Sequence, residues 1–257
     1  MLEHISVMRD TCVDLLTPAI GKSESPVVVD ATLGLGGHSE ALLDSNPNIV
    51  LIGIDRDLDA IVKAKNRLAK FENRVKLNHA IFDEITDVVN SFGFEQVDGI
   101  LFDLGVSSMQ LDQSDRGFSY SQDAPLDMRM DRSTGITASE IVNTYAPGEL
   151  VRILRTYGEE KFATRIVENI VKERAKAPLN STTQLATLVK ESIPAATRRT
   201  GGNPAKRTFQ ALRIETNDEL GAVNRAIPQA LELLKVGGRL VVMSFQSLED
   251  RIVKEIF

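Results

Sequence analysis

The segment that decides the fold reads Val27-Val28-Val29-Asp30-Ala31-Thr32-Leu33-Gly34-Leu35-Gly36-Gly37-His38. Its three valines predict a short buried strand that ends at an acid. The glycines that follow allow the backbone to come close to a nucleotide-like ligand. A helix is expected to begin near His38, which gives the order strand, glycine loop and helix. This order is typical of the first unit of an α/β sheet.

The residues downstream repeat the alternation of strand and helix. Further strands are predicted at 49–55, 75–80, 97–103 and 239–245, and 57–71 has the apolar stripe of an amphipathic helix. Several of these strands end in an acid or in a glycine turn. The sequence therefore predicts an α/β fold with a mostly parallel sheet that has helices on both faces.

The middle of the chain has a different pattern. A polar, Asp-rich loop is expected first, and helical patterns follow it without a convincing strand among them, around 147–157, 159–177 and 182–192. An all-helical block inside an α/β chain is typical of an inserted domain. We therefore predict a core made of residues 1–111 and 213–257, with a helical insert at 112–212 that serves substrate recognition.

The helix that leads back to the core is predicted to begin at Asn217. Asparagine is a favoured N-cap residue, and Asp218 and Glu219 would then lie in the first turn, where the helix dipole favours acids. Apolar residues at spacings of three and four continue this helix to Leu234, and the residues 235–238 are expected to end it.

The composition of the 257-residue chain is that of a folded protein, with 42% hydrophobic and 26% charged residues. The single cysteine, Cys12, excludes an intramolecular disulfide and a cysteine-rich metal site, and it favours a reducing compartment. The longest strongly apolar stretch, 49–54, is far shorter than the ~18 residues of a membrane-spanning helix. The first four residues lack a secretory pattern. We expect a cytoplasmic protein with no membrane partner and no metal.

Charge is distributed unevenly along the sequence. The formal net charge is −6, and an acidic protein is a poor default binder of nucleic acid, because phosphate attraction supplies most non-specific affinity. The stretch from Arg198 to Arg213, however, contains five cations and no acid. A charge run is usually a solvated face. If this one binds RNA, Arg198, Arg199, Lys206 and Arg207 are the candidates for phosphate contacts.

The second predicted strand places an acid where a ribose would lie. Asp55 follows Gly36 by 19 residues, close to the ~20-residue offset at which an acid binds ribose hydroxyls in doubly wound folds. Asp55 could instead cap a helix or pair with Arg56. A dinucleotide site requires G-x-G-x-x-G, and Ser39 occupies the place of the third glycine. S-adenosylmethionine has no pyrophosphate and needs only backbone clearance, so the loop favours a methyl donor.

The fourth predicted strand ends at Asp103, followed by the loop Leu104–Gln110. Ligands of open α/β sheets bind beyond the carboxyl ends of the strands, so Asp103 is expected to face the same crevice as Gly36 and Asp55. The alternative is a loop acid that accepts hydrogen bonds from nearby backbone amides.

These segments resemble the bacterial 16S ribosomal RNA cytosine-N4 methyltransferase family, in order and over essentially the whole chain. The resemblance rests on the glycine loop, on Gly53-Ile54-Asp55-Arg56-Asp57 and on four further motifs, which span 103–108, 116–120, 125–130 and 244–251. It implies a Rossmann-like methyltransferase core with a helical insert. It also implies S-adenosylmethionine as the donor, S-adenosylhomocysteine as the product, and a cytidine in the decoding region of the small-subunit RNA as the substrate.

The resemblance assigns cofactor contacts motif by motif, to Gly36, Gly37, His38, Asp55, Phe82, Asp103 and Gln110. Phe82 would pack against adenine, although by itself it is better explained as a core phenylalanine. The expected partner is 16S ribosomal RNA or the small ribosomal subunit, and a homodimer is compatible with the resemblance. Two departures stand out. Gln246 occupies the place of the family's usual histidine, which puts a general base there in doubt. Family members also generally continue beyond the position of Phe257, so the sheet is expected to lack an edge, or the chain to be shortened.

The chemistry requires acceptors for the two N–H bonds of a cytosine amino group, whose lone pair is delocalised into the ring. The candidates are Asp103 and the loop that follows it, with Ser107 and Ser108. Phe118 or Tyr120 would hold the extruded base by stacking, or else the two rings anchor the Asp-rich loop. Two alternatives remain open at this point, a nicotinamide-dependent oxidoreductase on the same fold and a non-catalytic RNA-binding factor with a vestigial cofactor pocket.

Overall fold

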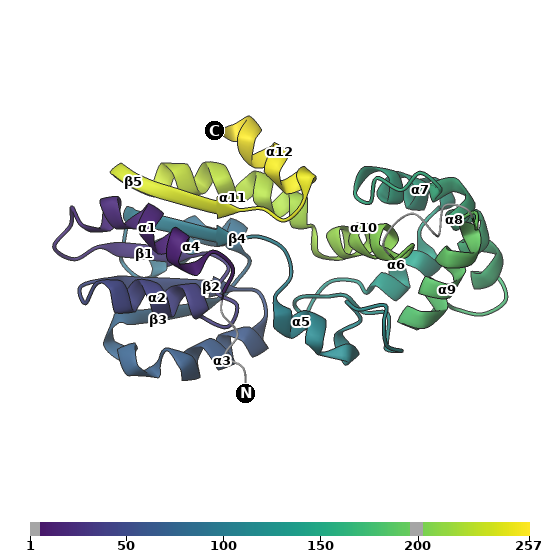
Figure 1. Cartoon of the computed structure of the whole chain (residues 1–257), viewed down its shortest axis with the longest axis horizontal. Helices are drawn as coiled ribbons and strands as arrows, with labels where there is room; N and C mark the ends of the chain where they lie inside the picture. Colours follow the sequence, from purple (N-terminus) through teal and green to yellow (C-terminus); the bar gives the residue numbers. More distant parts are fainter. Residues whose placement is uncertain (1–5, 196–202) are drawn as a thin grey trace. The chain divides into compact units, whose positions relative to one another are not determined.

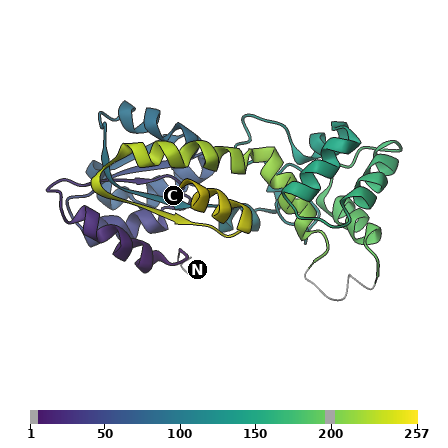
Figure 2. The same cartoon turned by 90° about the horizontal axis from the view of Figure 1, so that it is seen from above.

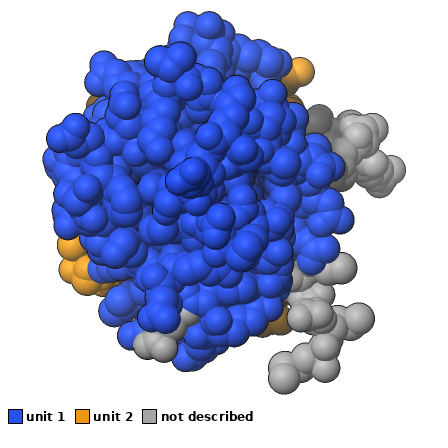
Figure 3. Space-filling model, turned by 90° about the vertical axis from the view of Figure 1, so that its left-hand side faces the viewer, with its two compact units in different colours: residues 1–105, 220–257 blue, residues 106–219 orange. Residues whose placement is uncertain are grey.

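The computed structural model describes residues 6–195 and 203–257 and divides the chain into two compact units, which Figure 3 shows in different colours. Unit 1 comprises Met1–Gly105 and Leu220–Phe257, and unit 2 comprises Val106–Glu219. Unit 2 is therefore inserted into unit 1. These bounds differ from the predicted insert at 112–212. Residues 106–111 and 213–219, which were predicted in the core, belong to unit 2.

Unit 1 contains the predicted parallel sheet. Its five strands are all parallel and lie in the order β3-β2-β1-β4-β5 (Figure 1). The chain runs from β1 to β2 and β3 on one side and then to β4 and β5 on the other. The carboxyl ends of β1 and β4 thus meet at the switch point of the sheet, where open α/β sheets bind ligands. The strands are β1 (Val27–Asp30), β2 (Val50–Asp55), β3 (Val75–His79), β4 (Val97–Asp103) and β5 (Leu234–Met243).

The last strand begins earlier than predicted. Residues 235–238 were expected to end a helix, but they belong to β5, where an irregularity in the register lies opposite Val97 and Gly99. Gly237 has a φ of 84°, which accommodates this irregularity without a side-chain clash.

Two apolar layers cover the sheet. On one face the side chains of α1, α2 and α3 form a buried cluster with Val28, Leu51 and Leu101. On the other face α4, α11 and α12 pack against Val29 and Phe102. Figure 2 shows α11 lying along the strands. The helices of unit 1 are α1 (Arg9–Ile20), α2 (Gly37–Ser45), α3 (Leu58–Arg67), η1 (Ala69–Arg74), η2 (Phe82–Glu84), α4 (Ile85–Ser91), α11 (Glu219–Leu233, of which Glu219 belongs to unit 2) and α12 (Ser247–Ile256).

Unit 2 is helical in its described part and has a core of its own. Its buried apolar residues come from α6 to α10 and from the loop before them. The helices predicted around 147–157 and 182–192 are present, and the one predicted at 159–177 is shorter. The helices of unit 2 are α5 (Ser108–Asp112), η3 (Ser114–Arg116), α6 (Ala138–Thr144), α7 (Pro147–Thr156), α8 (Ala163–Arg174), α9 (Thr182–Ser192) and α10 (Lys206–Asn217).

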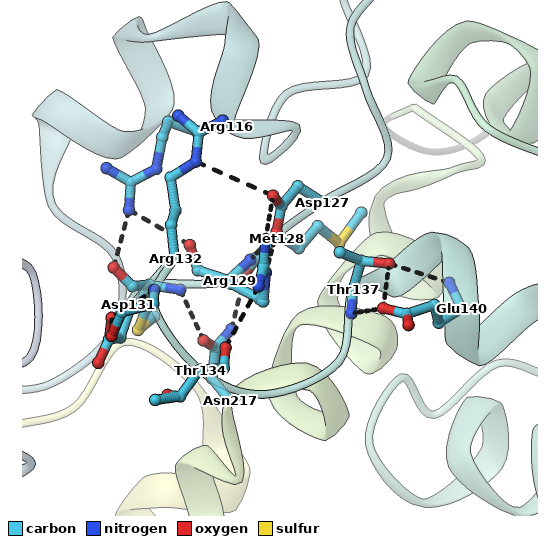
Figure 4. A network of polar contacts seen from close by, with 12 residues as sticks. Arg116, Asp127, Met128, Arg129, Asp131, Arg132, Thr134, Thr137, Glu140 and Asn217 are labelled. Atoms are coloured by element: carbon cyan, nitrogen blue, oxygen red, sulfur yellow. Dashed lines mark hydrogen bonds and ion pairs between the residues drawn. The ribbon is translucent and has the colours of Figure 1, made fainter.

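Asn217 does not cap a helix, so this prediction was wrong. It is the last residue of α10, is 3% exposed, and its side chain bonds to a distant loop (Figure 4). Its Oδ1 accepts a hydrogen bond from Met130 N at 2.8 Å, and its Nδ2 donates one to Met128 O at 2.8 Å. Asp218, in the left-handed conformation, separates α10 from α11.

The Asp-rich loop is held by the same network. Arg116 is 1% exposed and donates hydrogen bonds to the carbonyl oxygens of Arg129 and Met130, while Asp127 binds Arg129 (Figure 4). Gly117 has a φ of +74°, and a Cβ there would lie 2.3 Å from Pro125 O. The loop is therefore a packed part of unit 2, because its backbone polar groups are bound by buried side chains.

Candidate active site

The loop after β1 is bound to the acid at the end of β2. Gly34 N donates a hydrogen bond to Asp55 Oδ2 at 2.7 Å, and Asp57 N donates one to Asp55 Oδ1 at 2.8 Å. Burial raises the pKa of Asp55 to about 6. Each carboxylate oxygen can accept a further hydrogen bond, so Asp55 can still bind a ligand hydroxyl. The structure thus places Asp55 beside the glycine loop, as the spacing predicted.

The glycines lead into the N-terminus of α2. Gly36 precedes the helix with a φ of 76°, a conformation that residues with a side chain rarely adopt. Gly37 and His38 are the first two residues of the helix, where N–H groups have no partner within the helix. A Cβ at Gly37 would lie 2.1 Å from Ser6 Oγ. Gly37 therefore lets the segment around Ser6 approach the start of α2.

Asp103 lies at the end of β4, and its side chain is 27% exposed. Its backbone N–H donates to Thr32 Oγ1 at 2.6 Å, which connects β4 to the loop after β1. The His38 Nδ1 atom is 3.7 Å from Asp103 Oδ2, and His38 Nε2 is 2.9 Å from Val7 O. Burial raises the pKa of Asp103 to about 6, while His38 opposes that increase.

A third acid, Asp30, completes this edge of the sheet. It is 1% exposed, accepts a hydrogen bond from Ser39 Oγ at 2.6 Å, and its pKa is raised by burial. Its negative charge also raises the pKa values of Asp55 and Asp103. Among residues 6–195 and 203–257, no lysine or arginine forms an ion pair with these three acids. The site therefore favours a ligand with a positive charge and hydroxyl donors.

Sequence reasoning gave Asp30 and Ser39 no role in the site. The sequence identifies Ser39 only as the residue that replaces the third glycine of a dinucleotide loop. The structure gives the physical reason for a serine there, since its hydroxyl binds the buried carboxylate of Asp30. An acid at the end of the first strand, nine residues before a serine, was the available signal.

Phe82 lies at the start of η2 and packs against the core of unit 1. Its ring contacts that of Phe102, with the centroids 5.6 Å apart and the planes at 85°. The ring is only partly buried. This position agrees with the core alternative, and adenine packing by the remaining surface of the ring stays a prediction.

The predicted site residues after Asp103 belong to unit 2. Ser107 caps α5, and its hydroxyl accepts from Gln110 N, while Gln110 Oε1 accepts from Ser107 N at 3.1 Å. Gln110 is 5% exposed. Ser108 begins α5, and its side chain lies outside what the structure describes. Ser107 and Gln110 thus form a capping box, and their roles in catalysis and cofactor binding stay predictions.

The two aromatic candidates differ in burial. Phe118 is 7% exposed and belongs to the core of unit 2, as the anchoring alternative expects. The Tyr120 ring is partly exposed and contacts Phe209 edge to face at 5.4 Å. Of the two, Tyr120 is therefore the better candidate for stacking on a base.

The basic stretch is described only in part. Arg198 and Arg199 lie outside the described residues, whereas Lys206 and Arg207 are exposed in the first turn of α10. Arg213 binds Glu219 through two hydrogen bonds of 2.7 and 2.8 Å. The charge of Arg213 is therefore paired within unit 2, and this cation lies outside the four candidates for phosphate contacts.

In the part of the chain that the structure covers, no helix has both the length and the apolar character needed to cross a bilayer. Within the same residues, no group of three or more His, Cys, Asp and Glu side chains could hold a metal ion.

The sequence of this chain is similar to those of known proteins. A family model described as the MraW methylase family matches residues 1–257. The chain is 58% identical to a protein of Salinispora tropica named "Ribosomal RNA small subunit methyltransferase H", over 98% of this chain and 68% of that protein. It is also 58% identical to a protein of the same name from Streptomyces avermitilis, over 99% and 80%. The solved structure of PKMT2 from Rickettsia typhi aligns with a TM-score of 0.34 at 14% identity, covering 99% of this chain and 44% of that one.

Proposed function

The chain belongs to the MraW methylase family, and from that premise we propose that it transfers a methyl group from S-adenosylmethionine to the exocyclic N4 of a cytidine in the decoding region of 16S ribosomal RNA. The names of the relatives support the RNA class. The observation that carries the proposal is the contact of Asp55 with Gly34 in the loop after β1, close to Asp30, which in turn lies close to Asp103. Membership in a methylase family removes the oxidoreductase alternative.

The residues of unit 1 fit the cofactor. Asp55 would accept the ribose hydroxyls, and the N–H groups of Gly37 and His38 at the start of α2 would hold the carboxylate of the methionine part. The acids Asp30 and Asp103 favour a cation. When bound, S-adenosylmethionine supplies a methyl carbon made electrophilic by its sulfonium. The protein supplies orientation, which can lower a barrier by roughly 7–11 kcal/mol.

Asp103 is the candidate acceptor for the amino group. Its carboxylate is partly exposed. Asp103 is the last residue of β4, and its backbone N–H donates a hydrogen bond to Thr32 Oγ1. A carboxylate at this position can accept a hydrogen bond from an N–H of the cytosine amino group and stabilise the charge that develops on nitrogen. Ribosomal RNA as the substrate also agrees with a cytoplasmic location and with the small subunit as partner.

The experiment that tests the function is methyl transfer from labelled S-adenosylmethionine to 16S RNA that lacks the modification, offered both free and in small subunits. We expect label in RNA, mapped by mass spectrometry to N4 of one cytidine. Label on another base or another atom would correct the substrate. If the protein binds the cofactor but transfers no label to either acceptor, it is a non-catalytic factor and the proposal is wrong.

We also propose that the N-terminus of α10 binds the RNA backbone. Replacing Lys206 and Arg207 together by glutamine removes two exposed cations from its first turn. For single-stranded RNA, each lost phosphate contact is expected to reduce the slope of log affinity against log salt by about 0.7, so the pair reduces it by about 1.4. Fluorescence anisotropy over a range of salt concentrations measures this slope.

The matched control removes two exposed lysines elsewhere in unit 2, Lys172 on α8 and Lys190 on α9. The control has the same change in net charge, so a purely global electrostatic effect would appear in both variants. Equal slopes in the two double variants would show that α10 does not contact phosphate.

A further inference from the structure

The buried ring of His38 has an oxygen atom near each of its two nitrogens. The ring is 6% exposed at the start of α2. Nε2 lies 2.9 Å from Val7 O, and Nδ1 lies 3.7 Å from Asp103 Oδ2. Neither ring nitrogen therefore points to solvent. A contact of His38 with the cofactor would be made through its backbone N–H.

The contact with Val7 determines which ring nitrogen of His38 carries a hydrogen. A backbone carbonyl can only accept a hydrogen bond, so Nε2 carries the hydrogen in that contact. A neutral ring then presents the Nδ1 lone pair to Asp103, and a protonated ring presents an N–H. Only the protonated ring is attracted by the Asp103 carboxylate. At 3.7 Å the pair interacts through charge, since this distance exceeds that of a hydrogen bond.

The other groups around Asp103 have the opposite effect. Asp30 at the end of β1 and Glu249 on α12 are negative, and both raise the pKa of Asp103. Cys12 on α1 faces the same group, and its thiol pKa is itself raised to about 11, chiefly by burial and then by Asp103 and Asp30. Glu249 is fixed by Phe245 N and Gln246 Nε2, at 3.1 and 2.7 Å. His38 is thus the group that opposes protonation of Asp103.

We propose that His38 is a positioning residue for methyl transfer, which keeps the Asp103 carboxylate ionised so that it can accept the proton lost by the target amino group. The inference rests on the proposed function. The nitrogen lone pair forms the new C–N bond, the electron pair of the C–S bond leaves with sulfur, and the N4 proton passes to Asp103. Solvent then takes the proton from Asp103. His38 favours this loss because its charge stabilises the ionised carboxylate, which is needed for the next turnover.

The test replaces His38 by glutamine, whose amide N–H can still donate to Val7 O but carries no charge. Carbon-detected NMR follows the Asp103 carboxyl of the free protein against pH. Without the neighbouring cation, we expect its pKa to rise by on the order of one pH unit. The matched control is His79→Gln, because His79 Nε2 also lies 2.9 Å from a backbone carbonyl, that of Arg56, but it does not face Asp103. Its Asp103 titration should be that of the wild type.

Activity provides a second, independent measurement. For His38→Gln, kcat should fall about twofold near pH 7 and about tenfold below pH 5, and it should recover at higher pH, with the acidic limb displaced in the same direction as the NMR titration. An unchanged Asp103 titration would overturn the inference, as would loss of cofactor affinity with no displacement of the limb. If His38→Gln does not fold, His38→Asn gives the same NMR test. A wild-type protein that transfers no methyl group contradicts the proposed function, whereas the NMR result still decides the His38–Asp103 coupling.

Discussion

Asp55→Asn is expected to weaken binding of S-adenosylmethionine about a hundredfold, as measured by calorimetry at pH 8. The carboxylate accepts from Gly34 N and Asp57 N, and an amide offers only one oxygen. One backbone N–H therefore loses its partner, and the ribose loses a charged acceptor worth about 1.5–3 kcal/mol for each hydrogen bond. Because the pKa of Asp55 is about 6, wild-type affinity should fall as the pH drops below that value, whereas the variant should lack this dependence.

The matched control is Asp57→Asn in the same turn. Asp57 caps α3 by accepting from Asp59 N at 3.1 Å, and asparagine is an equally good N-cap residue. The same chemical change two residues away should therefore leave cofactor affinity nearly unchanged. Equal losses in both variants would show that the turn as a whole, and not the Asp55 carboxylate, determines binding.

Gly117→Ala is expected to destabilise unit 2 by about 2–5 kcal/mol. The left-handed backbone costs about 1–2 kcal/mol for a residue with a Cβ, and overpacking adds about 1–3 kcal/mol. The overlap is with backbone, since the added carbon would lie 2.3 Å from Pro125 O and 2.9 Å from Asp127 N. The chain has no tryptophan, and its three tyrosines, Tyr120, Tyr145 and Tyr157, all lie in unit 2. Tyrosine fluorescence during urea unfolding therefore reports on this unit.

Gly135→Ala separates the two contributions to that loss. Gly135 has a φ of +76°, almost that of Gly117, but no atom lies within 4 Å of its added Cβ. We expect it to cost about 1–2 kcal/mol, from the backbone alone. Similar midpoints for the two variants would mean that the segment around Pro125 moves aside at little cost.

The sheet and its polar edge could be predicted from sequence because both depend on local patterns. β-branched runs ending in Asp30, Asp55 and Asp103 identify strands, and parallel strands bring their carboxyl ends to one edge. The β-branched residues at 27–29 therefore located the first strand, and the spacing from the glycine loop located Asp55 at the same edge of the sheet. The family, which the matching family model confirms, and the S-adenosylmethionine cofactor that goes with it were likewise accessible from motifs.

Features that depend on distant partners could not be predicted in the same way. Asn217 has the local pattern of a helix cap, but its side chain binds Met128 and Met130, 87 to 89 residues away in sequence. The sequence around Phe118 allows either a stacking ring or an anchor, and only the packing of unit 2 shows that this ring is buried. The contact of His38 with Val7 likewise joins residues with no shared motif.

The position of the insert has a consequence for how the protein is synthesised. Phe102 in β4 pairs with Val242 in β5, yet all of unit 2 is translated between them. Until β5 emerges, β4 is an exposed hydrophobic sheet edge, a condition that promotes aggregation. Long-range pairing of this kind also slows folding, since the intervening loop must close first. A nascent chain paused within unit 2 would thus depend on chaperones to keep its unfinished sheet from associating with other chains.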